Sequence, residues 1–167
     1  MDLVVAETDA HFTDIARLLG AYHQWRLARY PEAGDAIDGP AARQAFDAKL
    51  ARLAEDFTFP NGMFLVAYDG DTPVGCAAMS RVNEDVCAIK RMFVAETHQR
   101  RGIGRRLAEA VIDDARTRGF TVMRLHSGRN QAEAHALYRA LGFEKVAPSP
   151  GRASADAAHL IFMERKL

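Results

Sequence analysis

Apolar residues recur at two different spacings along the chain, and the spacing changes at the turn Pro60-Asn61-Gly62. Before this turn the spacing is that of amphipathic helices, one ending at about Arg29 and a second one near Phe57. After it, three extended apolar runs alternate with turn residues, which predicts a three-stranded antiparallel meander. The runs cover 63–68, 72–81 and 86–94, and the turns are Asp69-Gly70-Asp71 and Asn83-Glu84-Asp85. A chain that carries both periods is expected to fold as a mixed α/β structure.

The remaining pattern adds elements on both sides of the meander. A short strand is predicted over 3–7, and Thr8-Asp9 is the N-cap signal of the first helix. A third helix is predicted from Gly102-Ile103-Gly104 to Gly119. The last predicted elements are a strand over 120–125, a helix that stops at Gly142, a strand over 143–146, a loop rich in Pro, Gly, Ser and Ala over 148–155, and a strand over 159–166. The predicted order is βααβββαβαββ, in a single domain over 1–167.

Composition and charge limit the class of protein. Of the 167 residues, 49% are apolar and 26% are charged, which is typical of a folded globular chain. Lys and Arg number 22, and so do Asp and Glu, so the net charge is zero and no nucleic-acid partner is expected. No apolar run approaches the roughly 20 residues of a membrane helix, and the N-terminus lacks the pattern of a signal peptide.

The cysteines and histidines bear on the compartment and on metal binding. Cys76 and Cys87 lie in apolar, strand-like runs without a CxxC partner, which predicts reduced core thiols in a cytoplasmic protein. The six histidines show neither an HExxH motif nor paired helical spacing, so no metal site is expected.

The segment from Gln99 to Arg106 joins the end of a predicted strand to the start of a predicted helix. Its glycines let main-chain N–H groups approach a ligand closely, and a helix N-terminus adds partial positive charge. Arg105 and Arg106 lie in the first helical turn, where each cation opposes the helix dipole at a cost of roughly 0.3–1 kcal/mol. A tight turn with a solvated basic face is the simpler interpretation. A multiply charged anion, such as a pyrophosphate, accounts better for the accumulated positive charge.

Two common phosphate-binding motifs do not fit this junction. A dinucleotide fingerprint requires a glycine at the position of Leu107 and an acidic residue about 20 residues later. A Walker P-loop requires Gly-Lys followed by Ser or Thr, and the junction lacks this sequence.

The spacing Gln99-x-x-Gly102-x-Gly104 resembles the pyrophosphate-binding motif of the GNAT family of N-acetyltransferases. Three other blocks are similar to that family in the same order: Lys90-Arg91-Met92-Phe93-Val94 resembles its central strand, and Asn130, Ala134 and Tyr138 precede a Leu141-Gly142-Phe143 segment. The resemblance implies a mixed central sheet that splays at its central strands and is flanked by helices.

The resemblance also implies acetyl-CoA as the acyl donor and no metal. Backbone N–H groups of residues 100–105 would hold the pyrophosphate, and Gln99 would close the loop. Main chain around Phe93 would pair with the pantetheine arm and polarise the acetyl carbonyl. The cofactor-binding residues expected on this basis are Met92, Phe93, Val94, Gln99, Arg100, Arg101, Gly102, Ile103, Gly104, Arg105, Asn130, Ala134 and Tyr138.

Tyr138 is the residue that the resemblance implies as general acid. A phenol with an ordinary pKa near 10 stays protonated at neutral pH and can donate to the departing thiolate. The alternative is a core aromatic that packs beside Leu137 and Leu141.

The base is less well defined by the sequence. An alkylamine has a pKa of about 10, so the acceptor must lose a proton before it attacks. Related sequences often have a Glu just before the Lys-Arg pair, but that position here is Ala88. Glu84, acting through water, and His126, whose residue type titrates near neutral pH, are the catalytic candidates. As alternatives, Glu84 is a turn residue and His126 is a packed histidine.

The expected function is acetyl transfer from acetyl-CoA, by direct attack, to a primary amine of a small molecule or an amino-acid-like acceptor. The alternatives are a protein or peptide N-acetyltransferase and a non-catalytic acyl-CoA-binding sensor. The acceptor pocket is expected between the first two helices, with Tyr22, His23, Trp25 and Tyr30, and the loop over 148–155. The expected chain is a monomer or a homodimer without a membrane partner.

Overall fold

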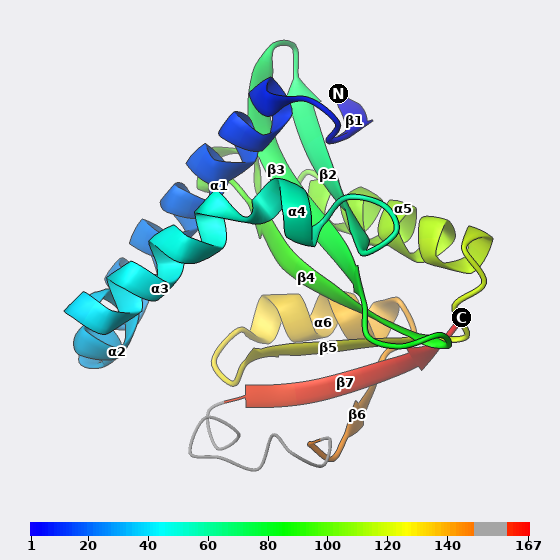
Figure 1. Ribbon diagram of the computed structural model, residues 1–167. Coiled ribbons are helices and arrows are strands. Elements are labelled where there is room, and N and C mark those ends of the chain that lie inside the picture. Colours follow the sequence, from blue (N-terminus) through cyan, green and yellow to red (C-terminus); the bar gives the residue numbers. More distant parts are fainter. Residues whose placement is uncertain (149–159) are drawn as a thin grey trace.

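Strands dominate the centre of the structure, a computed structural model that describes residues 1–148 and 160–167 (Figure 1). They are β1 (Asp2–Val5), β2 (Gly62–Asp69), β3 (Thr72–Arg81), β4 (Val86–Val94), β5 (Val122–Gly128), β6 (Glu144–Val146) and β7 (Leu160–Lys166). Together they form one sheet in the order β1-β2-β3-β4-β5-β7-β6. The predicted antiparallel meander is confirmed as β2, β3 and β4.

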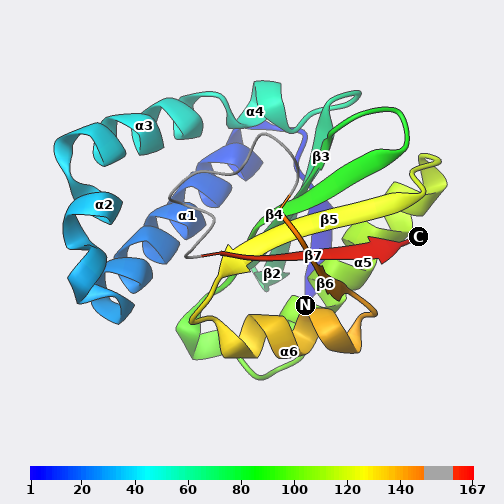
Figure 2. The same ribbon diagram turned by 90° about the horizontal axis from the view of Figure 1, so that it is seen from below.

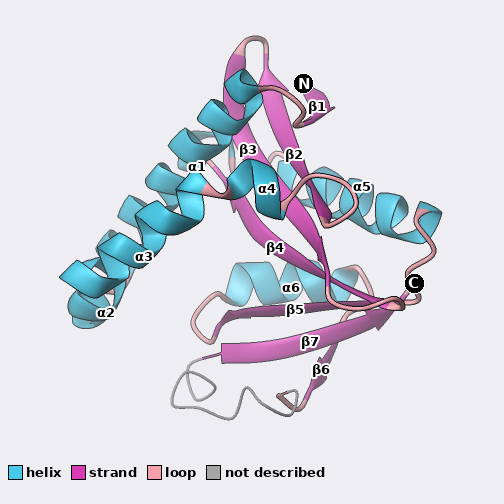
Figure 3. Cartoon of the chain, viewed as in Figure 1, coloured by secondary structure: helices cyan, strands magenta, loops and turns pink. Residues whose placement is uncertain are grey.

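The helices follow the predicted order, with one region subdivided (Figure 3). They are α1 (Asp9–Arg29), α2 (Gly34–Asp38), α3 (Pro40–Ala51), α4 (Leu53–Asp56), α5 (Ile103–Thr117) and α6 (Ala132–Ala140), with 3-10 turns at Pro31–Ala33 and Glu96–His98. The predicted second helix is divided into α3 and α4 at Arg52, whose backbone (φ −108°, ψ 10°) leaves the helical region. Between the two predicted helices the chain contains a further short helix, α2, which ends where Gly39 and Pro40 start α3.

The long helix α1 begins and ends where local chemistry favours it. The Thr8 side chain accepts a hydrogen bond from the His11 N–H at 3.3 Å. Asp9 lies in the first turn, and Arg26 and Arg29 lie in the last turn, so all three charges suit the helix dipole. Pro31 follows the C-cap and prevents the helix from continuing.

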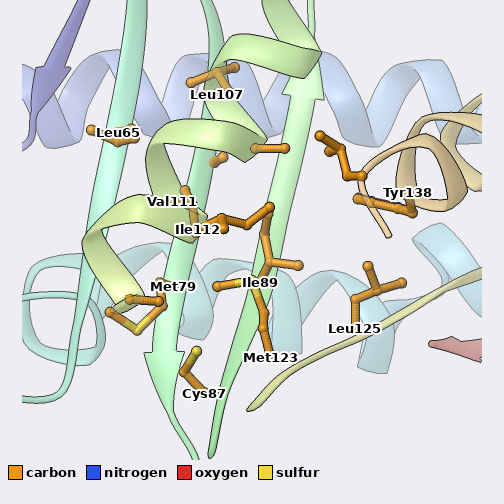
Figure 4. Packing of buried hydrophobic residues seen from close by; sticks show 14 of the residues in the cluster. Leu65, Met79, Cys87, Ile89, Leu107, Val111, Ile112, Met123, Leu125 and Tyr138 are labelled. Carbon is orange, nitrogen blue, oxygen red and sulfur yellow. The ribbon is translucent and has the colours of Figure 1, made fainter. Parts of the chain in front are cut away.

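The sheet separates two apolar clusters, because side chains alternate between its faces. On one face α5 packs Leu107, Val111 and Ile112 against the strands, together with residues of α6 (Figure 4). On the other face α1 and α4 cover Phe64 and Val66 of β2. The view from below shows α1 and α3 on one side of the strands and α5 and α6 on the other (Figure 2).

The splay expected between the central strands is confirmed. β4 and β5 run parallel and pair only from Val86 to Ala88, opposite Val122 to Arg124. Beyond Ala88 the two strands separate, although β4 continues to Val94 and β5 to Gly128. This separation leaves the end of β4 without a neighbouring strand on its β5 side, in the middle of the sheet, while β3 still pairs with its other side.

Two other predictions concern the last strand with the loop before it, and the absence of a membrane helix. The last strand begins at Leu160 in the described part of the chain, and the loop expected over 148–155 lies outside the described residues from position 149 on. Within 1–148 and 160–167, no helix has the length and apolarity required to span a membrane.

Candidate active site

A cleft of about 650 Å³ lies at the end of β4, beside the region where β4 and β5 have separated. Its walls come from α1, the end of β4, the loop into α5, the first turn of α5, and α6. The lining residues are Tyr22, Trp25, Arg29, Met92, Phe93, Val94, Glu96, His98, Gln99, Arg100, Gly102, Ile103, Gly104, Arg105, Gln131, Glu133, Ala134, Leu137 and Tyr138. The cleft therefore gathers residues from three separate stretches of the sequence, 22–29, 92–105 and 131–138.

The N-terminus of α5 opens on this cleft. Gly102 is the N-cap residue, with a left-handed backbone (φ 79°, ψ 0°), and it has no side chain with which to cap the helix. The first N–H groups of a helix lack acceptors within the helix, and here the first turn contains no acidic residue. A Cβ atom at Gly102 would meet nothing within 4 Å, so the space beside it is open. This arrangement suits a bound phosphate.

Gly104 lies in the wall of the cleft between β4 and α6. A Cβ atom at this position would lie 3.6 Å from Leu137 Cδ2 and 3.7 Å from Val94 Cγ2. These are ordinary contact distances, so a methyl group fits, whereas a longer side chain would compete for the space of the cleft.

The four arginines of the junction have different surroundings. Arg100 and Arg105 line the cleft, and the Arg105 Nε donates to Glu109 at 2.9 Å. Arg106 points elsewhere and donates to the main-chain carbonyl of Met1 at 3.4 Å. Arg101 is exposed and is not part of the cleft wall. The expected positive charge beside the cleft is therefore carried by two of the four side chains.

The loop between β4 and α5 is closed by a side chain. Gln99 Nε2 donates to the Val94 carbonyl at 3.1 Å, across the 3-10 turn Glu96–His98. Arg100, the next residue, has a positive φ of 62°, which is uncommon for a residue other than glycine. The hydrogen bond and the reversed backbone together turn the chain from the strand toward Gly102.

A β-bulge interrupts β4 next to the cleft. Lys90 lies opposite Ala78 and Phe93 lies opposite Cys76, so β4 has one extra residue in this interval. Arg91 absorbs the irregularity with a φ of 54°. Because β5 has already separated from β4, main-chain groups of this segment are available to a ligand that pairs as an extra strand.

Tyr138 lies in the wall of the cleft and is mostly buried. Its ring packs edge-on against Phe143, with ring centroids 5.7 Å apart, and projects from α6 toward the strands (Figure 4). Burial raises the pKa of Tyr138 above its usual value, and the Tyr22 phenol acts in the same direction. The hydroxyl therefore stays protonated at neutral pH, in the form that can donate a proton.

An aromatic wall formed by Tyr22, Trp25 and Phe93 faces the cleft from α1 and β4. Tyr22 stacks on Trp25 at 5.9 Å and contacts Phe93 at 5.4 Å between ring centroids. The Tyr22 hydroxyl accepts from Gln131 Nε2 at 3.3 Å, and Gln131 Oε1 accepts from Ser127 at 2.6 Å. This chain of hydrogen bonds links α1 to α6 and to the separated end of β5.

Comparison with known proteins identifies the family of this chain. A family model described as the acetyltransferase (GNAT) family matches residues 20–143, well over half of the chain. The chain belongs to the GNAT family. A protein named IAA acetyltransferase, from Azospirillum brasilense, is 41% identical over 109 residues, which cover 65% of this chain and 70% of that protein.

Solved structures agree with this GNAT fold. An acetyltransferase from Streptococcus agalactiae has a TM-score of 0.78 at 18% identity, covering 99% of this chain and 98% of the other. The PaiA N-acetyltransferase from Thermoplasma acidophilum, solved in complex with coenzyme A, has a TM-score of 0.71 at 15% identity and full coverage of both chains. The chain is accordingly an N-acetyltransferase that depends on acetyl-CoA.

The structure gathers many of the predicted site residues of this GNAT enzyme at one cleft. These residues are Met92, Phe93, Val94, Gln99, Arg100, Gly102, Ile103, Gly104, Arg105, Ala134 and Tyr138. Asn130 is exposed and lies before α6, outside the cleft wall, and Arg101 also lies outside it. Asn130 precedes the helix, so its side chain does not share the face that Ala134 and Tyr138 present to the cleft.

The structure does not bring Glu84 to the cleft. Glu84 is an exposed turn residue that precedes β4. At about 3.3 Å per residue, the start of β4 at Val86 lies roughly 20 Å from Met92. The prediction that Glu84 acts as a base is therefore not supported by its position. The strand β4 starts beside Glu84 and reaches the cleft only at its other end.

His126 lies on an exposed face of β5, and its role as a base stays a prediction. It is exposed on β5, whereas Leu125 and Ser127 on either side of it are buried on the opposite face. Its ring lies 6.1 Å from the Phe162 ring, which belongs to the antiparallel partner β7. His126 is thus neither packed in the core nor part of the cleft wall, but it lies on the separated end of β5.

Some residues of the cleft were not expected from the sequence. Gln131, the N-cap residue of α6, and Leu137 of α6 line the cleft, and Arg29 and Glu133 form an ion pair at 3.4 Å between α1 and α6. Gln131 lies three residues before Ala134 and seven before Tyr138, so helical spacing alone could have found it. Arg29 and Glu133 are 104 positions apart, and no local pattern relates them.

The four residues expected in the acceptor pocket divide into two groups. Tyr22 and Trp25 line the cleft. His23 is buried elsewhere, where its Nε2 lies 2.9 Å from Asp38, and Tyr30 packs edge-on against Trp25 at 6.2 Å. In the described ranges 1–148 and 160–167, no cluster of three or more His, Cys, Asp or Glu could hold a metal ion.

Proposed function

We propose that the chain transfers the acetyl group of acetyl-CoA to a primary amine of a small molecule or an amino-acid-like acceptor, by direct attack. The observation that carries this proposal is the single cleft in which a bare helix N-terminus, a bulged strand and a tyrosine hydroxyl meet an aromatic wall. The first three features suit acetyl-CoA, and the aromatic wall of α1 leaves a place for an acceptor of limited size. The relative from Azospirillum brasilense carries the name of an acetyltransferase for a named compound, which agrees with a small-molecule acceptor.

The cysteines support direct attack rather than an acetylated thiol. Burial raises the pKa of both Cys76 and Cys87 to about 12. Neither residue lines the cleft. A thiol nucleophile requires a reachable thiolate, and these two side chains provide none at neutral pH. Their burial as free thiols also agrees with the proposed cytoplasmic location.

The proposed donor site runs from α5 to β4. N–H groups at the start of α5, beginning with Gly102, would hold the pyrophosphate, and Arg100 and Arg105 would add charge. Main chain near Phe93 would pair with the pantetheine arm and polarise the acetyl carbonyl. When bound, acetyl-CoA supplies an activated acetyl group and a thiolate leaving group. Tyr138 would hold the proton that this sulfur requires.

The proposed acceptor site lies toward α1. The aromatic wall of Tyr22, Trp25 and Phe93 would contact the acceptor's apolar part. For the amine proton we propose His126, directly or through water, because it lies on the separated end of β5. The enzyme would act as a monomer or a homodimer without a nucleic-acid or membrane partner.

The proposal is tested by measuring thiol release from acetyl-CoA with a panel of acceptors. The panel contains alkylamines, amino acids, aromatic amines, and peptides with free N-termini or lysines. We expect saturable turnover with at least one small amine and much lower kcat/KM with the peptides. Turnover confined to peptides would refute the small-molecule acceptor. Tight acetyl-CoA binding without turnover on any acceptor would favour a non-catalytic sensor.

A further inference from the structure

Arg91 owes its position to the bulge in β4. Regular alternation from Lys90 would put Met92 on the α1 face and Phe93 on the α5 face. Instead, Met92 packs against the cluster that contains α5, and Phe93 belongs to the cluster that contains α1. The extra residue that shifts this alternation is Arg91, with its left-handed backbone at φ 54°.

The Arg91 side chain lies on the α1 face of the sheet. The ionisable groups that act on it are Tyr22 of α1, Asp56 of α4 and Cys76 of β3, which all belong to that side. Tyr22 also lines the cleft and contacts Phe93. Arg91 is not itself part of the cleft lining, but it lies behind this aromatic part of the wall, within electrostatic range of Tyr22. The side chain is only partly buried, so a ligand can reach it.

The Nε atom of Arg91 lacks a hydrogen-bond partner within the described part of the chain. This atom is buried, and no described carboxylate lies within ion-pair distance of the side chain. Asp56, the acidic group that acts on Arg91, is paired with Arg52 at 3.2 Å. A buried donor without an acceptor destabilises a fold, and burial lowers the pKa of Arg91 accordingly. An arginine held in this state suits an acceptor group that arrives with a ligand.

We propose that Arg91 binds the carboxylate of an amino carboxylate acceptor, and so directs the acceptor's amine toward the acetyl group beside Phe93. This inference rests on the proposed function and narrows its acceptor class. A guanidinium binds a carboxylate through two parallel hydrogen bonds, which fixes orientation as well as position. An acceptor held at its carboxylate would present its amine from a constant direction.

The three arginines that line the cleft are less suited to this role. Arg100 lies in the loop proposed to hold the pyrophosphate. Arg29 is paired with Glu133 at 3.4 Å, and Arg105 is paired with Glu109 at 2.9 Å. In both pairs a glutamate already neutralises the positive charge of the arginine, which an acceptor carboxylate would otherwise use. A single negative charge also fits the Arg91 site better than a phosphate dianion, because Asp56 lies on the same side and repels additional charge.

The test compares matched acceptors in matched variants. One pair is L-phenylalanine and 2-phenylethylamine, and a second is L-leucine and 3-methylbutylamine, which differ only by the carboxylate. We expect the wild type to prefer the amino acid in kcat/KM, and Arg91→Gln to reduce that preference by about 10- to 100-fold. Arg91→Lys, which keeps the charge but not the fork, should retain part of the preference. Arg116→Gln, at the far end of α5 and paired with Asp113 at 3.1 Å, is the control expected to change nothing.

A binding measurement separates this inference from the proposed function. Calorimetry with L-phenylalanine or L-leucine in the presence of coenzyme A involves no turnover. We expect the wild type to bind the amino acid, and Arg91→Gln to bind it about 10- to 100-fold more weakly with unchanged acetyl-CoA affinity. Equal binding by both proteins, no binding by the wild type, or an unchanged kcat/KM ratio would overturn the inference. Absence of turnover on every amine would instead refute the proposed function. Arg91→Lys provides the comparison if Arg91→Gln does not fold.

Discussion

Tyr138 combines two properties that a proton donor needs. It lines the cleft, and burial keeps its hydroxyl protonated by raising its pKa. A raised pKa also makes the phenol a weaker acid, so proton transfer to the sulfur depends on the same desolvation making the departing thiolate more basic. The aromatic ring contributes separately to packing, through its edge-on contact with Phe143 at 5.7 Å.

Tyr138→Phe separates these two contributions, because it removes only the hydroxyl. We expect kcat to fall by about 10²-fold or more, with little change in stability or in acetyl-CoA affinity. Steady-state kinetics, calorimetry and urea denaturation measure the three quantities. Tyr68→Phe is the matched control, since Tyr68 donates to Asp14 at 2.7 Å outside the cleft. A Tyr138→Phe enzyme with normal kcat would show that the thiolate takes its proton from water.

Substitutions of His126 and Glu84 are expected to affect the pH profile of kcat/KM differently. If His126 removes the amine proton, kcat/KM rises with pH and levels off, and His126→Gln flattens this limb. Glu84 lies roughly 20 Å or more from the cleft along β4, so Glu84→Gln should leave the profile unchanged. The measurement is kcat/KM from pH 5.5 to 9 for both variants. Identical profiles for the wild type and His126→Gln would assign deprotonation to solvent.

At the scale of elements, α5 determines where an anion can bind. This helix of 15 residues begins at the cleft, with N–H groups that no side chain caps and with two arginines in its first turn. The arrangement is unfavourable for the isolated helix, because the cations oppose the dipole. A bound pyrophosphate would make the same arrangement favourable, because its negative charge attracts both the arginines and the helix N-terminus. The same glycine that exposes the N–H groups, Gly102, also turns the chain out of the preceding loop.

Gly102→Val tests this element, and Gly119→Val is its control. Both glycines have left-handed backbones, at φ 79° and φ 84°, and at both a Cβ would meet nothing within 4 Å. Each substitution should therefore cost a similar backbone strain, roughly 1–2 kcal/mol of unfolding free energy. Only Gly102→Val should weaken acetyl-CoA binding, by 10-fold or more on the basis of the lost phosphate contacts. Wild-type affinity in a folded Gly102→Val protein, measured by calorimetry, would remove the phosphate site from α5.

At the scale of the whole molecule, the sheet holds two clusters apart and opens between them. The bulge and the early end of the β4–β5 pairing coincide, so the opening occurs where main-chain groups are free to bind. The contacts between α1 and α6, Tyr22 with Gln131 at 3.3 Å and Arg29 with Glu133 at 3.4 Å, cross this opening. The cleft therefore depends on elements that pack on both faces of the sheet.

The thiols and phenols whose pKa is raised in the folded state predict how the stability of the whole molecule changes at high pH. Burial raises the pKa of Cys76, Cys87 and Tyr68 to about 12, and it also raises the pKa of Tyr138. The folded state keeps these protons at pH values where the unfolded chain releases them. Their stabilisation is complete below the unfolded pKa values, about 8.5 for thiols and 10 for phenols, and is lost as pH rises above them.

We therefore expect the free energy of unfolding to fall between pH 8.5 and pH 11. Each group that ionises only on unfolding contributes a slope of up to about 1.4 kcal/mol per pH unit. Urea denaturation at several pH values measures this slope. A Cys76→Ala, Cys87→Ala protein should show a shallower fall between pH 8.5 and pH 10. A wild-type stability that does not change over this range would contradict the assignment.

The part of the fold predictable from sequence was the part encoded locally. The change of apolar period identified the helices and the meander, and the spacing Gln99-x-x-Gly102-x-Gly104 identified the turn into α5. Residues within one helix or one tight turn interact over a few positions, so their pattern survives in a single sequence. The subdivision at Arg52 was missed because the apolar spacing continues across it.

The tertiary structure decided which of these residues share a cleft. Glu84, in the turn before β4, and Phe93, near the end of β4, were both expected at the site, yet the length of the strand separates them. Arg29 and Glu133, 104 positions apart, meet only because α1 and α6 flank the same opening. The bulge at Arg91 reverses the face of every later residue of β4, and a change of register leaves no trace in a local pattern. The sequence by itself thus determined the elements and the donor-binding turn, whereas packing across the splayed sheet decided the composition of the acceptor side.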